Sequence, residues 1–267
     1  MPDVSEALKR IVATVNEGHR VSLFLDYDGS LREIERTPDA ASPTPELLEL
    51  LQQLNDRMDL ETTIISGRSA GDLLAFVGRF PRLGLIAEHG ALLRAPGESE
   101  WHDRRRELDL RWMDAVRPVL EMHAQSTPGC FVEEKGTSLV WHYRRADPEF
   151  GKWKAGELLS ELSTMLANAP VSVRHGRKIV EVTPLQISKG AAVKKTLNRR
   201  PAELAVVVGD DATDESMFEL PDEQLVSIRI GPGDTRAAYQ LPTPASLRAF
   251  LRRLLQSTAN KPRSAAT

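Results

Sequence analysis

Two carboxylates, Asp26 and Asp28, follow a short apolar run of the sequence, and Gly29 and Ser30 come directly after them. The apolar run predicts a buried strand, and Gly29 lets the chain loop as it leaves the sheet. Two carboxylates at the end of such a strand form a hard oxygen site that suits Mg²⁺. One of them could also attack phosphorus while the other transfers a proton. Asp-Gly pairs also mark ordinary turns, so this segment alone leaves both interpretations open.

Three more segments carry groups that could complete such a site. Ser66 ends a second apolar run, Lys189 stands at the start of a predicted helix, and Asp210 ends a third apolar run. A hydroxyl group, an ammonium group and a further carboxylate can hold a phosphoryl group and a metal ion. Each has a plainer interpretation, because Ser66 could cap a helix and Lys189 could be a solvated surface lysine. The order and position of all four segments together favour a catalytic site.

Short apolar runs alternate with helical patterns over much of the chain. Apolar residues recur at helical spacing before the first strand and near the carboxyl terminus, and Ser69 with Asp72 resembles a capping box. This alternation predicts an α/β fold with a parallel sheet covered by helices on both faces. Ligands of such sheets bind outside the carboxyl ends of the strands, which is where the carboxylates and the hydroxyl group described above fall. The later predicted elements are helices at 187–197, 217–220 and 247–255 and strands at 204–208 and 225–230.

The order of apolar runs and helical patterns in the sequence changes between residues 96 and 183. A helical stretch from Leu108 to Leu120 leads into two alternating runs joined at Gly136, and a second helix around Leu162 leads into two more short runs. Two such units predict an antiparallel sheet backed by helices on one face. Because this insert lies between the second and third segments described above, we expect a lid that excludes water and contacts substrate. The predicted domains are a core of residues 1–95 and 184–267 and an inserted α+β cap of residues 96–183.

The composition is that of an ordinary globular protein. The chain has 267 residues, 41% of them hydrophobic and 27% charged, and its formal net charge of -3 gives no reason to expect nucleic-acid binding. Cys130 is the only cysteine, so an internal disulfide is impossible and a reducing compartment fits. No run approaches the roughly 20 apolar residues needed to cross a bilayer, and the first residues do not form a secretion signal. We therefore expect a soluble, cytoplasmic protein without a membrane or nucleic-acid partner, and we take a monomer as the expected state.

The four chemical segments resemble the four motifs of the haloacid-dehalogenase-like phosphatases. Asp26-Tyr-Asp28-Gly-Ser is similar to the first motif, Ser66-Gly67-Arg68 to the second, Ser188-Lys189-Gly190 to the third, and Gly209-Asp210-Asp211-Ala-Thr-Asp214 to the fourth. The resemblance implies a Rossmann-like parallel-sheet core with an inserted cap. It implies that Asp26 is the nucleophile, Asp28 the general acid and base, and Ser66 and Lys189 the groups that stabilise the phosphoryl oxygens. It also implies Mg²⁺ as the cofactor, bound by Asp26, Asp28, Asp210 and Asp214, although Asp214 could instead orient Lys189.

The insert and a short segment before it carry a closer resemblance. The segments from Ala87 to Ala91, from Glu133 to Asp147 and from Gly176 to Pro184 look like those of the trehalose-6-phosphate phosphatases. This resemblance runs from about His19 to about Arg248 and implies hydrolysis of a phosphorylated disaccharide through an aspartyl-phosphate. Sugar hydroxyls need acceptors such as Glu and donors such as Lys, although the same residues on exposed strands could equally be solvated. The implied substrate-binding residues are Gly67, Arg68, Glu133, Lys135, His142, Arg144, Lys178 and Glu181.

Two positions depart from the pattern of that family. Ser30 replaces the usual Thr and keeps the hydroxyl group, whereas Arg32 and Glu33 stand in a stretch that is otherwise more neutral. Arg32 could favour a different, acidic substrate or could simply point to solvent, and we favour solvent. Two alternative functions stay open. One is a phosphatase of another osmolyte, such as a glucosylglycerol or glycosylglycerate phosphate. The other is a non-catalytic sugar-phosphate sensor, against which the intact carboxylates and Lys189 argue.

Overall fold

The chain folds into two compact units. The computed structural model describes residues 3–35, 37, 39–176, 178–220 and 224–258. The first unit comprises Met1–Asp103 and Ser188–Thr267, and the second comprises Arg104–Ile187. The second unit is therefore an insertion into the first. Its first boundary falls after the strand β5 (His102–Asp103), because β5 pairs with β4 (Leu92–Arg94) in the sheet of the first unit.

The first unit is built on an eight-stranded sheet in the order β12-β11-β10-β1-β2-β3-β4-β5. The strands from β12 to β3 in this order run parallel, and β4 returns antiparallel to β3. Every residue of the central strand β1 is buried, as expected for a strand that is covered on both faces. The parallel sheet predicted from the sequence is confirmed. The remaining strands are β1 (Val21–Asp26), β2 (Leu60–Ile65), β3 (Gly84–Ala87), β10 (Leu204–Gly209), β11 (Leu225–Ile230) and β12 (Tyr239–Leu241).

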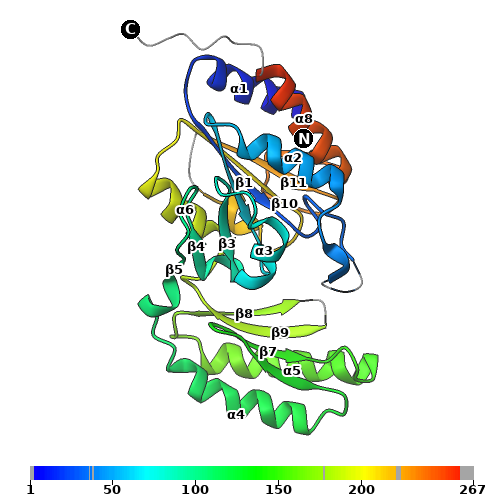
Figure 1. The fold of residues 1–267 in the computed structure, drawn as a ribbon. Helices are drawn as coiled ribbons and strands as arrows, with labels where there is room; N and C mark the ends of the chain where they lie inside the picture. Colours follow the sequence, from blue (N-terminus) through cyan, green and yellow to red (C-terminus); the bar gives the residue numbers. More distant parts are fainter. Residues whose placement is uncertain (1–2, 36, 38, 177, 221–223, 259–267) are drawn as a thin grey trace. The chain divides into compact units, whose positions relative to one another are not determined.

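Helices cover both faces of this sheet (Figure 1). The capping signal at Ser69 is confirmed, because Ser69 accepts the N–H of Asp72. Thr44 accepts the N–H of Leu47 in the same way. One face packs against α1 (Val4–Asn16), α2 (Pro45–Asn55), α3 (Ala70–Val77) and α8 (Pro244–Thr258). The other face packs against α6 (Lys189–Arg199) and α7 (Glu215–Phe218). The described residues also form the short 3-10 helices η1 (Asp39–Ala41), η2 (Glu88–Gly90) and η3 (Arg104–Glu107).

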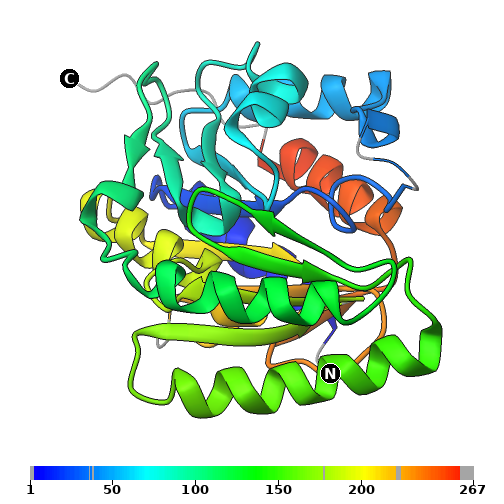
Figure 2. The same cartoon turned by 90° about the horizontal axis from the view of Figure 1, so that it is seen from below.

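The second unit has its own sheet and its own hydrophobic core. Its antiparallel strands lie in the order β6-β7-β9-β8, and both helices of the unit pack on one face, which Figure 2 shows from the helix side. Trp141 is fully buried between this face and the helices. The helix-backed antiparallel sheet predicted from the sequence is confirmed. Its elements are β6 (Phe131–Glu134), β7 (Leu139–His142), β8 (Val171–Gly176), β9 (Ile179–Pro184), α4 (Trp112–Gln125) and α5 (Pro148–Met165).

One helix of the second unit begins later than its apolar pattern predicts. The pattern starts at Leu108, but α4 begins at Trp112. The carboxylate of Asp109 accepts the backbone N–H of Arg111 at 3.0 Å, which is a local turn that competes with helix formation.

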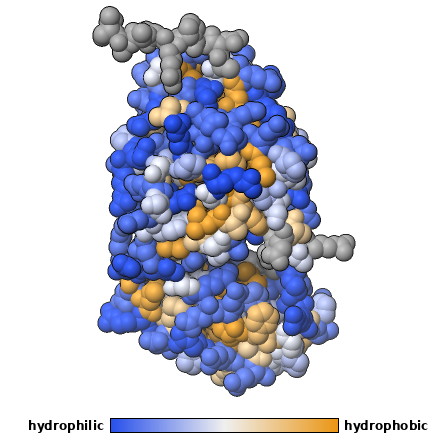
Figure 3. All heavy atoms as spheres, in the orientation of Figure 1, coloured by the Kyte–Doolittle hydropathy of each residue, from blue (hydrophilic) through white to orange (hydrophobic). Residues whose placement is uncertain are grey.

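The surface is mixed in character. The side shown in Figure 3 is mainly hydrophilic, with smaller hydrophobic areas on both units. Among the described residues, we find no helix whose length and apolar character would let it span a membrane.

Candidate active site

The groups predicted to do chemistry in the first unit gather at one edge of its sheet. Asp26 is the last residue of β1, Ser66 follows β2 directly, and Asp210 follows β10 directly. These three strands are neighbours and run parallel, so their carboxyl ends meet at this edge. Lys189 reaches the same edge from the first turn of α6, whose start is capped by Ser188.

The glycine after Asp28 allows two of these loops to approach each other. Gly29 has a φ of +86°, which side chains rarely adopt, and a Cβ atom there would lie 2.1 Å from Oδ2 of Asp210. Its N–H donates to the carbonyl of Arg32 at 2.7 Å, which closes the loop. Only glycine at this position lets the Asp210 carboxylate come close to the loop that follows β1.

Lys189 lies between two carboxylates. Its Nζ atom is 2.6 Å from Oδ1 of Asp26 and 2.7 Å from Oδ1 of Asp214, and the residue is only 3% exposed. The other oxygen of Asp214 accepts the backbone N–H groups of Asp210 and Asp211. Both oxygens of Asp214 thus already have partners, and this arrangement suits a residue that orients Lys189.

The carboxylates of the site fit a divalent cation. Asp26, Asp210 and Asp214 each offer one oxygen within 4.8 Å of the others. Oδ2 of Asp26 is buried and has no hydrogen-bond partner, which is costly for a charged oxygen unless an ion or a ligand compensates it. The three carboxylates carry more negative charge than the single ammonium group of Lys189 can neutralise, and a bound cation would supply the remaining positive charge. Oxygen ligands of this kind suit hard cations such as Mg²⁺.

The pKa values reflect this excess of negative charge. Burial raises the pKa of Asp26 to about 7 although Lys189 opposes the shift, and the carboxylate of Asp210 adds to it. Burial, with Asp214 and Asp211, raises the pKa of Asp210 to about 6. Burial, with Asp26, raises the pKa of Asp214 to about 8. For Lys189, burial acts against the charged form, but Asp26 and Asp214 outweigh it and raise the pKa.

These shifts predict how stability depends on pH without metal. The folded pKa values of Asp26 and Asp214, about 7 and about 8, lie above the ordinary value of 3.8. Folding therefore takes up protons at pH values between the ordinary pKa and the folded pKa of each group. The free energy of unfolding should therefore fall as pH rises through this window. We expect the thermal unfolding midpoint in EDTA to fall from pH 5 to pH 8, and to fall less steeply in Asp26→Asn. A midpoint that rises, or an equal slope in both proteins, would contradict the assignment.

The second acidic residue of the first motif has a different partner. Both oxygens of Asp28 accept hydrogen bonds from the guanidinium group of Arg68 at 2.7 Å. Arg68 in turn lies over the rings of Tyr27 and Phe76. Among the described residues, the Asp28 carboxylate is not part of the cluster that could hold a metal. Arg68, predicted as a substrate-binding residue, here fixes the orientation of Asp28, and Gly67 lies between it and Ser66.

Three of the predicted sugar-binding residues share one face of the second sheet. Strand register places Glu133, His142 and Glu181 on the face opposite the helices. Oε2 of Glu133 is 2.8 Å from Nε2 of His142, whose ring stacks on Phe131. Glu181 accepts a hydrogen bond from Ser138 at 3.0 Å.

The other three lie in loops that follow strands of this sheet. Lys135 follows β6, Arg144 follows β7, and Lys178 lies between β8 and β9. The ammonium group of Lys178 is 5.4 Å from the centre of the Tyr143 ring, and Lys178 itself has a φ of +68°. The structure thus brings Glu133, His142 and Glu181 together and sets the three cationic residues at strand ends.

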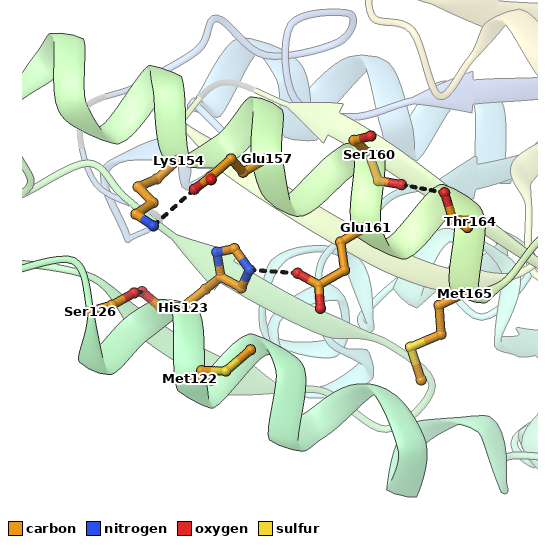
Figure 4. A pocket seen from close by; sticks show the side chains of 9 residues that line it. All are labelled: Met122, His123, Ser126, Lys154, Glu157, Ser160, Glu161, Thr164 and Met165. Carbon is orange, nitrogen blue, oxygen red and sulfur yellow. Dashed lines mark hydrogen bonds and ion pairs between the residues drawn. The ribbon is translucent and has the colours of Figure 1, made fainter.

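The helices of the second unit enclose a separate groove of about 840 Å³ between α4 and α5 (Figure 4). A contact of 2.9 Å between His123 and Glu161 joins the two helices across it. The groove is lined by Met122, His123, Ser126, Lys154, Glu157, Ser160, Glu161, Thr164 and Met165. None of these is a residue predicted to bind the substrate.

Arg32 is not directed to solvent as expected from the sequence. Its guanidinium group pairs with Glu33 at 2.6 Å and with Glu35 at 2.8 Å, and only 15% of its side chain is exposed. Glu33 also pairs with Arg248 at 2.7 Å. The nearby carboxylates compensate the charge of Arg32, so this departure from the family pattern gives no reason to expect an acidic substrate.

The turn after β3 has a structural role that the sequence did not predict. Glu88 donates its N–H to the carbonyl of Arg68 at 2.9 Å, and His89 donates its N–H to the carbonyl of Ser66 at 3.0 Å. The turn therefore supports the loop that carries Ser66. In the sequence, Glu88 and His89 belong to a segment that resembles the trehalose-6-phosphate phosphatases. This resemblance does not predict which residues they contact.

The sequence and the structure of the chain are similar to those of known trehalose phosphatases. Residues 24–241 match the family model described as trehalose-phosphatase. The chain is 38% identical, over 87% of its length, to the bifunctional trehalose-6-phosphate synthase/phosphatase of Thermoproteus tenax, but it spans only 31% of that relative. The structure resembles the trehalose-6-phosphate phosphatase of Aspergillus fumigatus, with a TM-score of 0.76, 32% identity and coverage of 94% of this chain and 97% of that one.

A more distant structure agrees in fold alone. A haloacid dehalogenase-like hydrolase from Bacteroides thetaiotaomicron superposes with a TM-score of 0.65 at 15% identity, covering 88% of this chain and 99% of that one. The parallel sheet with an inserted antiparallel unit is therefore the haloacid-dehalogenase-like fold. Since a family model covers most of the sequence and relatives exceed 30% identity over most of its length, the chain belongs to the trehalose-phosphatase family.

Proposed function

We propose that this chain is a Mg²⁺-dependent phosphatase that hydrolyses trehalose 6-phosphate to trehalose and phosphate. The observation that carries the proposal is the buried carboxylate of Asp26. One of its oxygens is held by Lys189 and the other has no hydrogen-bond partner, in a chain of the trehalose-phosphatase family. A fixed carboxylate with one uncommitted oxygen is suited to nucleophilic attack.

In the first step, Asp26 attacks phosphorus. A bond forms between a carboxylate oxygen and phosphorus, the bond from phosphorus to the sugar oxygen breaks, and an aspartyl-phosphate results. Asp28 gives a proton to the departing sugar oxygen, so that trehalose leaves as a neutral alcohol. In the structure Arg68 donates to both oxygens of Asp28 at 2.7 Å and so orients this side chain, and Asp28 must release one of these hydrogen bonds to carry the proton that it gives.

In the second step, water hydrolyses the aspartyl-phosphate. Asp28 removes a proton from the water as its oxygen attacks phosphorus, and the bond to Asp26 breaks to release phosphate. Lys189 stays between Asp26 and Asp214 and neutralises negative charge, while Ser66 donates its hydroxyl hydrogen to a phosphoryl oxygen. Asp26 returns to its starting form, so the two steps together consume one water molecule.

The residues fit Mg²⁺ as the cofactor. The carboxylates of Asp26 and Asp210 and the backbone carbonyl of Asp28 would hold it, and Asp214 lies beside them on Lys189. When bound, Mg²⁺ would reduce the repulsion between the anionic carboxylate and the anionic phosphate.

The second unit would supply the contacts to the disaccharide. Glu133, Glu181 and His142 offer acceptors on one sheet face, and Lys135, Arg144 and Lys178 offer donors at the strand ends. A panel of phosphate esters tests the choice of substrate. Phosphate release from trehalose 6-phosphate should be faster, as kcat/KM, than from glucose 6-phosphate or a glucosylglycerol phosphate. Faster release from the glucosylglycerol phosphate would mean that the substrate is another phosphorylated osmolyte. Release from none of these esters would mean that the protein is a non-catalytic sugar-phosphate sensor.

Glu133→Ala should weaken the reaction of the disaccharide selectively. A hydrogen bond to a charged group contributes about 1.5–3 kcal/mol. We therefore expect kcat/KM for trehalose 6-phosphate to fall roughly 10- to 100-fold. Hydrolysis of a small aryl phosphate, which has no disaccharide to contact, should hardly change, and the measurement is phosphate release from both substrates.

Glu134→Ala is the matched control for this variant. Glu134 is the next residue of the same strand and pairs with Arg117 of α4 at 2.9 Å, so its side chain serves the helix side of the unit. Glu134→Ala should leave the ratio of kcat/KM for trehalose 6-phosphate to kcat/KM for the aryl phosphate unchanged. Equal losses on both substrates in Glu133→Ala would mean that Glu133 supports the fold, and no loss would mean that it is a solvated residue.

A further inference from the structure

The turn between β3 and β4 has an unusual backbone. Glu88, His89 and Gly90 have successive φ values of +49°, +53° and +106°. Positive φ is uncommon for residues with a Cβ atom, and turns that need it ordinarily use Asn or Gly. Two such residues in a row are strained, and strain of this kind is retained where the surroundings and the function require it. Apart from these two, Lys178 is the non-glycine residue with positive φ in the described chain.

This turn is tied to the loop that carries Ser66. The backbone N–H groups of Glu88 and His89 donate to the carbonyls of Arg68 and Ser66 at 2.9 and 3.0 Å, and the N–H of Ser66 donates to the carbonyl of Ile86 at 2.9 Å. Two hydrogen bonds thus join the turn to the Ser66 loop, and a third joins this loop to the end of β3. The position of the Ser66 loop follows the position of the turn.

The imidazole ring of His89 packs directly on this loop. A Cβ atom added to Gly67 would lie 2.4 Å from Nε2 and 2.5 Å from Cε1 of His89. The absence of a side chain at Gly67 is what lets the ring lie against the backbone. On its other side the turn approaches α6, because a Cβ atom added to Gly90 would lie 2.8 Å from the carbonyl oxygen of Ser188. The turn therefore lies against the Ser66 loop and against Ser188, the residue before Lys189.

The Ser66 hydroxyl depends on the same loop backbone. Its Oγ atom accepts the N–H of Arg68 at 3.2 Å, which leaves its own hydrogen free to donate. A shift of the peptide at Gly67 would move this N–H and with it the hydroxyl. Small displacements of a group that contacts the transition state reduce rates strongly.

We propose that His89 is a positioning residue, which holds the Gly67 backbone in place and thereby sets the Ser66 hydroxyl relative to Asp26. The left-handed backbone of the turn is what presents the His89 ring to Gly67. This inference rests on the proposed phosphatase activity. It assigns a reason for a strained turn that carries no group of the reaction itself.

His89→Gly separates this role from a purely structural one. Glycine adopts the positive φ without strain, which offsets the loss of ring packing and the larger entropy of the unfolded chain, so the thermal unfolding midpoint should fall little. The value of kcat for an aryl phosphate should fall about 10- to 100-fold while KM changes little. Glu88→Gly is the control, because it relieves the backbone strain at Glu88 without removing the His89 ring. It shows how much the relief of strain alone changes the unfolding midpoint. His89→Asn should recover part of kcat, since Asn tolerates this backbone and its amide occupies part of the space of the ring.

Gly67→Ala tests the contact through a double-mutant comparison. Alone, it should lower kcat, because the new methyl group displaces the His89 ring. In the His89→Gly background the same change should cost less, since the ring is gone. Equal losses in both backgrounds would overturn the contact.

The outcomes distinguish this inference from the proposed function. A wild-type protein that releases no phosphate from trehalose 6-phosphate or an aryl phosphate would refute the proposed function. An active wild type with an unchanged kcat in His89→Gly would refute only the role of His89. A parallel fall of kcat and unfolding midpoint, without recovery in His89→Asn, would also refute it, because that is the result expected of a structural residue.

Discussion

Asp26→Asn is expected to abolish turnover while the protein stays folded. An amide is isosteric with the carboxylate but cannot form the acyl-phosphate on which the proposed mechanism depends. Removal of the nucleophile in covalent mechanisms lowers kcat by about 10⁴-fold or more, and we expect a loss of this size in phosphate release. The fold should persist because Asn can still accept a hydrogen bond from Lys189, which also retains Asp214 at 2.7 Å.

The control for this prediction is a variant of a carboxylate near the site that is not given a chemical step. Asp72→Asn changes the exposed carboxylate at the start of α3, whose side chain bonds to Ser69 at 2.8 Å, and it should leave kcat unchanged. Circular dichroism and the unfolding midpoint show whether Asp26→Asn is folded. Steady-state activity above about one hundredth of the wild-type value, in a preparation free of deamidated protein, would rule out Asp26 as the nucleophile.

Metal removal should have the second-largest effect. EDTA should inactivate the protein fully, and Mg²⁺ should restore the activity, because the carboxylates of Asp26, Asp210 and Asp214 otherwise repel the phosphate. Ca²⁺ should restore little, since its larger radius and looser coordination would misplace the reacting groups. The measurement is kcat in EDTA, after dialysis, and after addition of each cation.

Asp210→Asn gives an independent test of where the cation binds. It removes one charge from the cluster but neither the nucleophile nor Lys189, so the Mg²⁺ concentration at half-maximal activity should rise well above the wild-type value. Full activity in EDTA, with metal shown to be absent by elemental analysis, would exclude the proposed cofactor. An unchanged Mg²⁺ requirement in Asp210→Asn would exclude Asp210 as a ligand.

The sequence predicted the central strands because each of their apolar runs ends abruptly in polar groups. Asp26, Ser66 and Asp210 come directly after such runs, and a parallel sheet must bring these ends together. By contrast, β4 has three residues and β5 has two, too few to show any period. The boundary between the units depends on these two strands, so the pattern of the sequence could not fix it.

The pairings within the site could not be predicted from spacing. Arg68 and Asp28 are 40 residues apart, and their contact depends on how two loops approach each other in space. The positive φ values of Glu88 and His89 could not be predicted either, because His adopts this conformation more often than most residues but still only rarely, and Glu has no such preference. Arg32 was expected in solvent since its local sequence is polar, but Glu33 and Glu35 close around it. Such contacts are set by packing and not by local preference.

The pairing of β1 with β10 constrains the order in which the protein folds. Arg20 and Glu203, at the start of these two strands, are hydrogen-bonded although they are 183 residues apart. The second unit is continuous in sequence and has its own core, so during synthesis its residues are complete before β10 has been translated. Closing a loop of this length is entropically costly, and domains fold as units while the chain emerges. The nucleophile and the carboxylates around it are therefore assembled late, when the inserted unit can already be folded. Until then, β1 lacks one of its neighbours, and its backbone N–H and C=O groups on that side are unpaired.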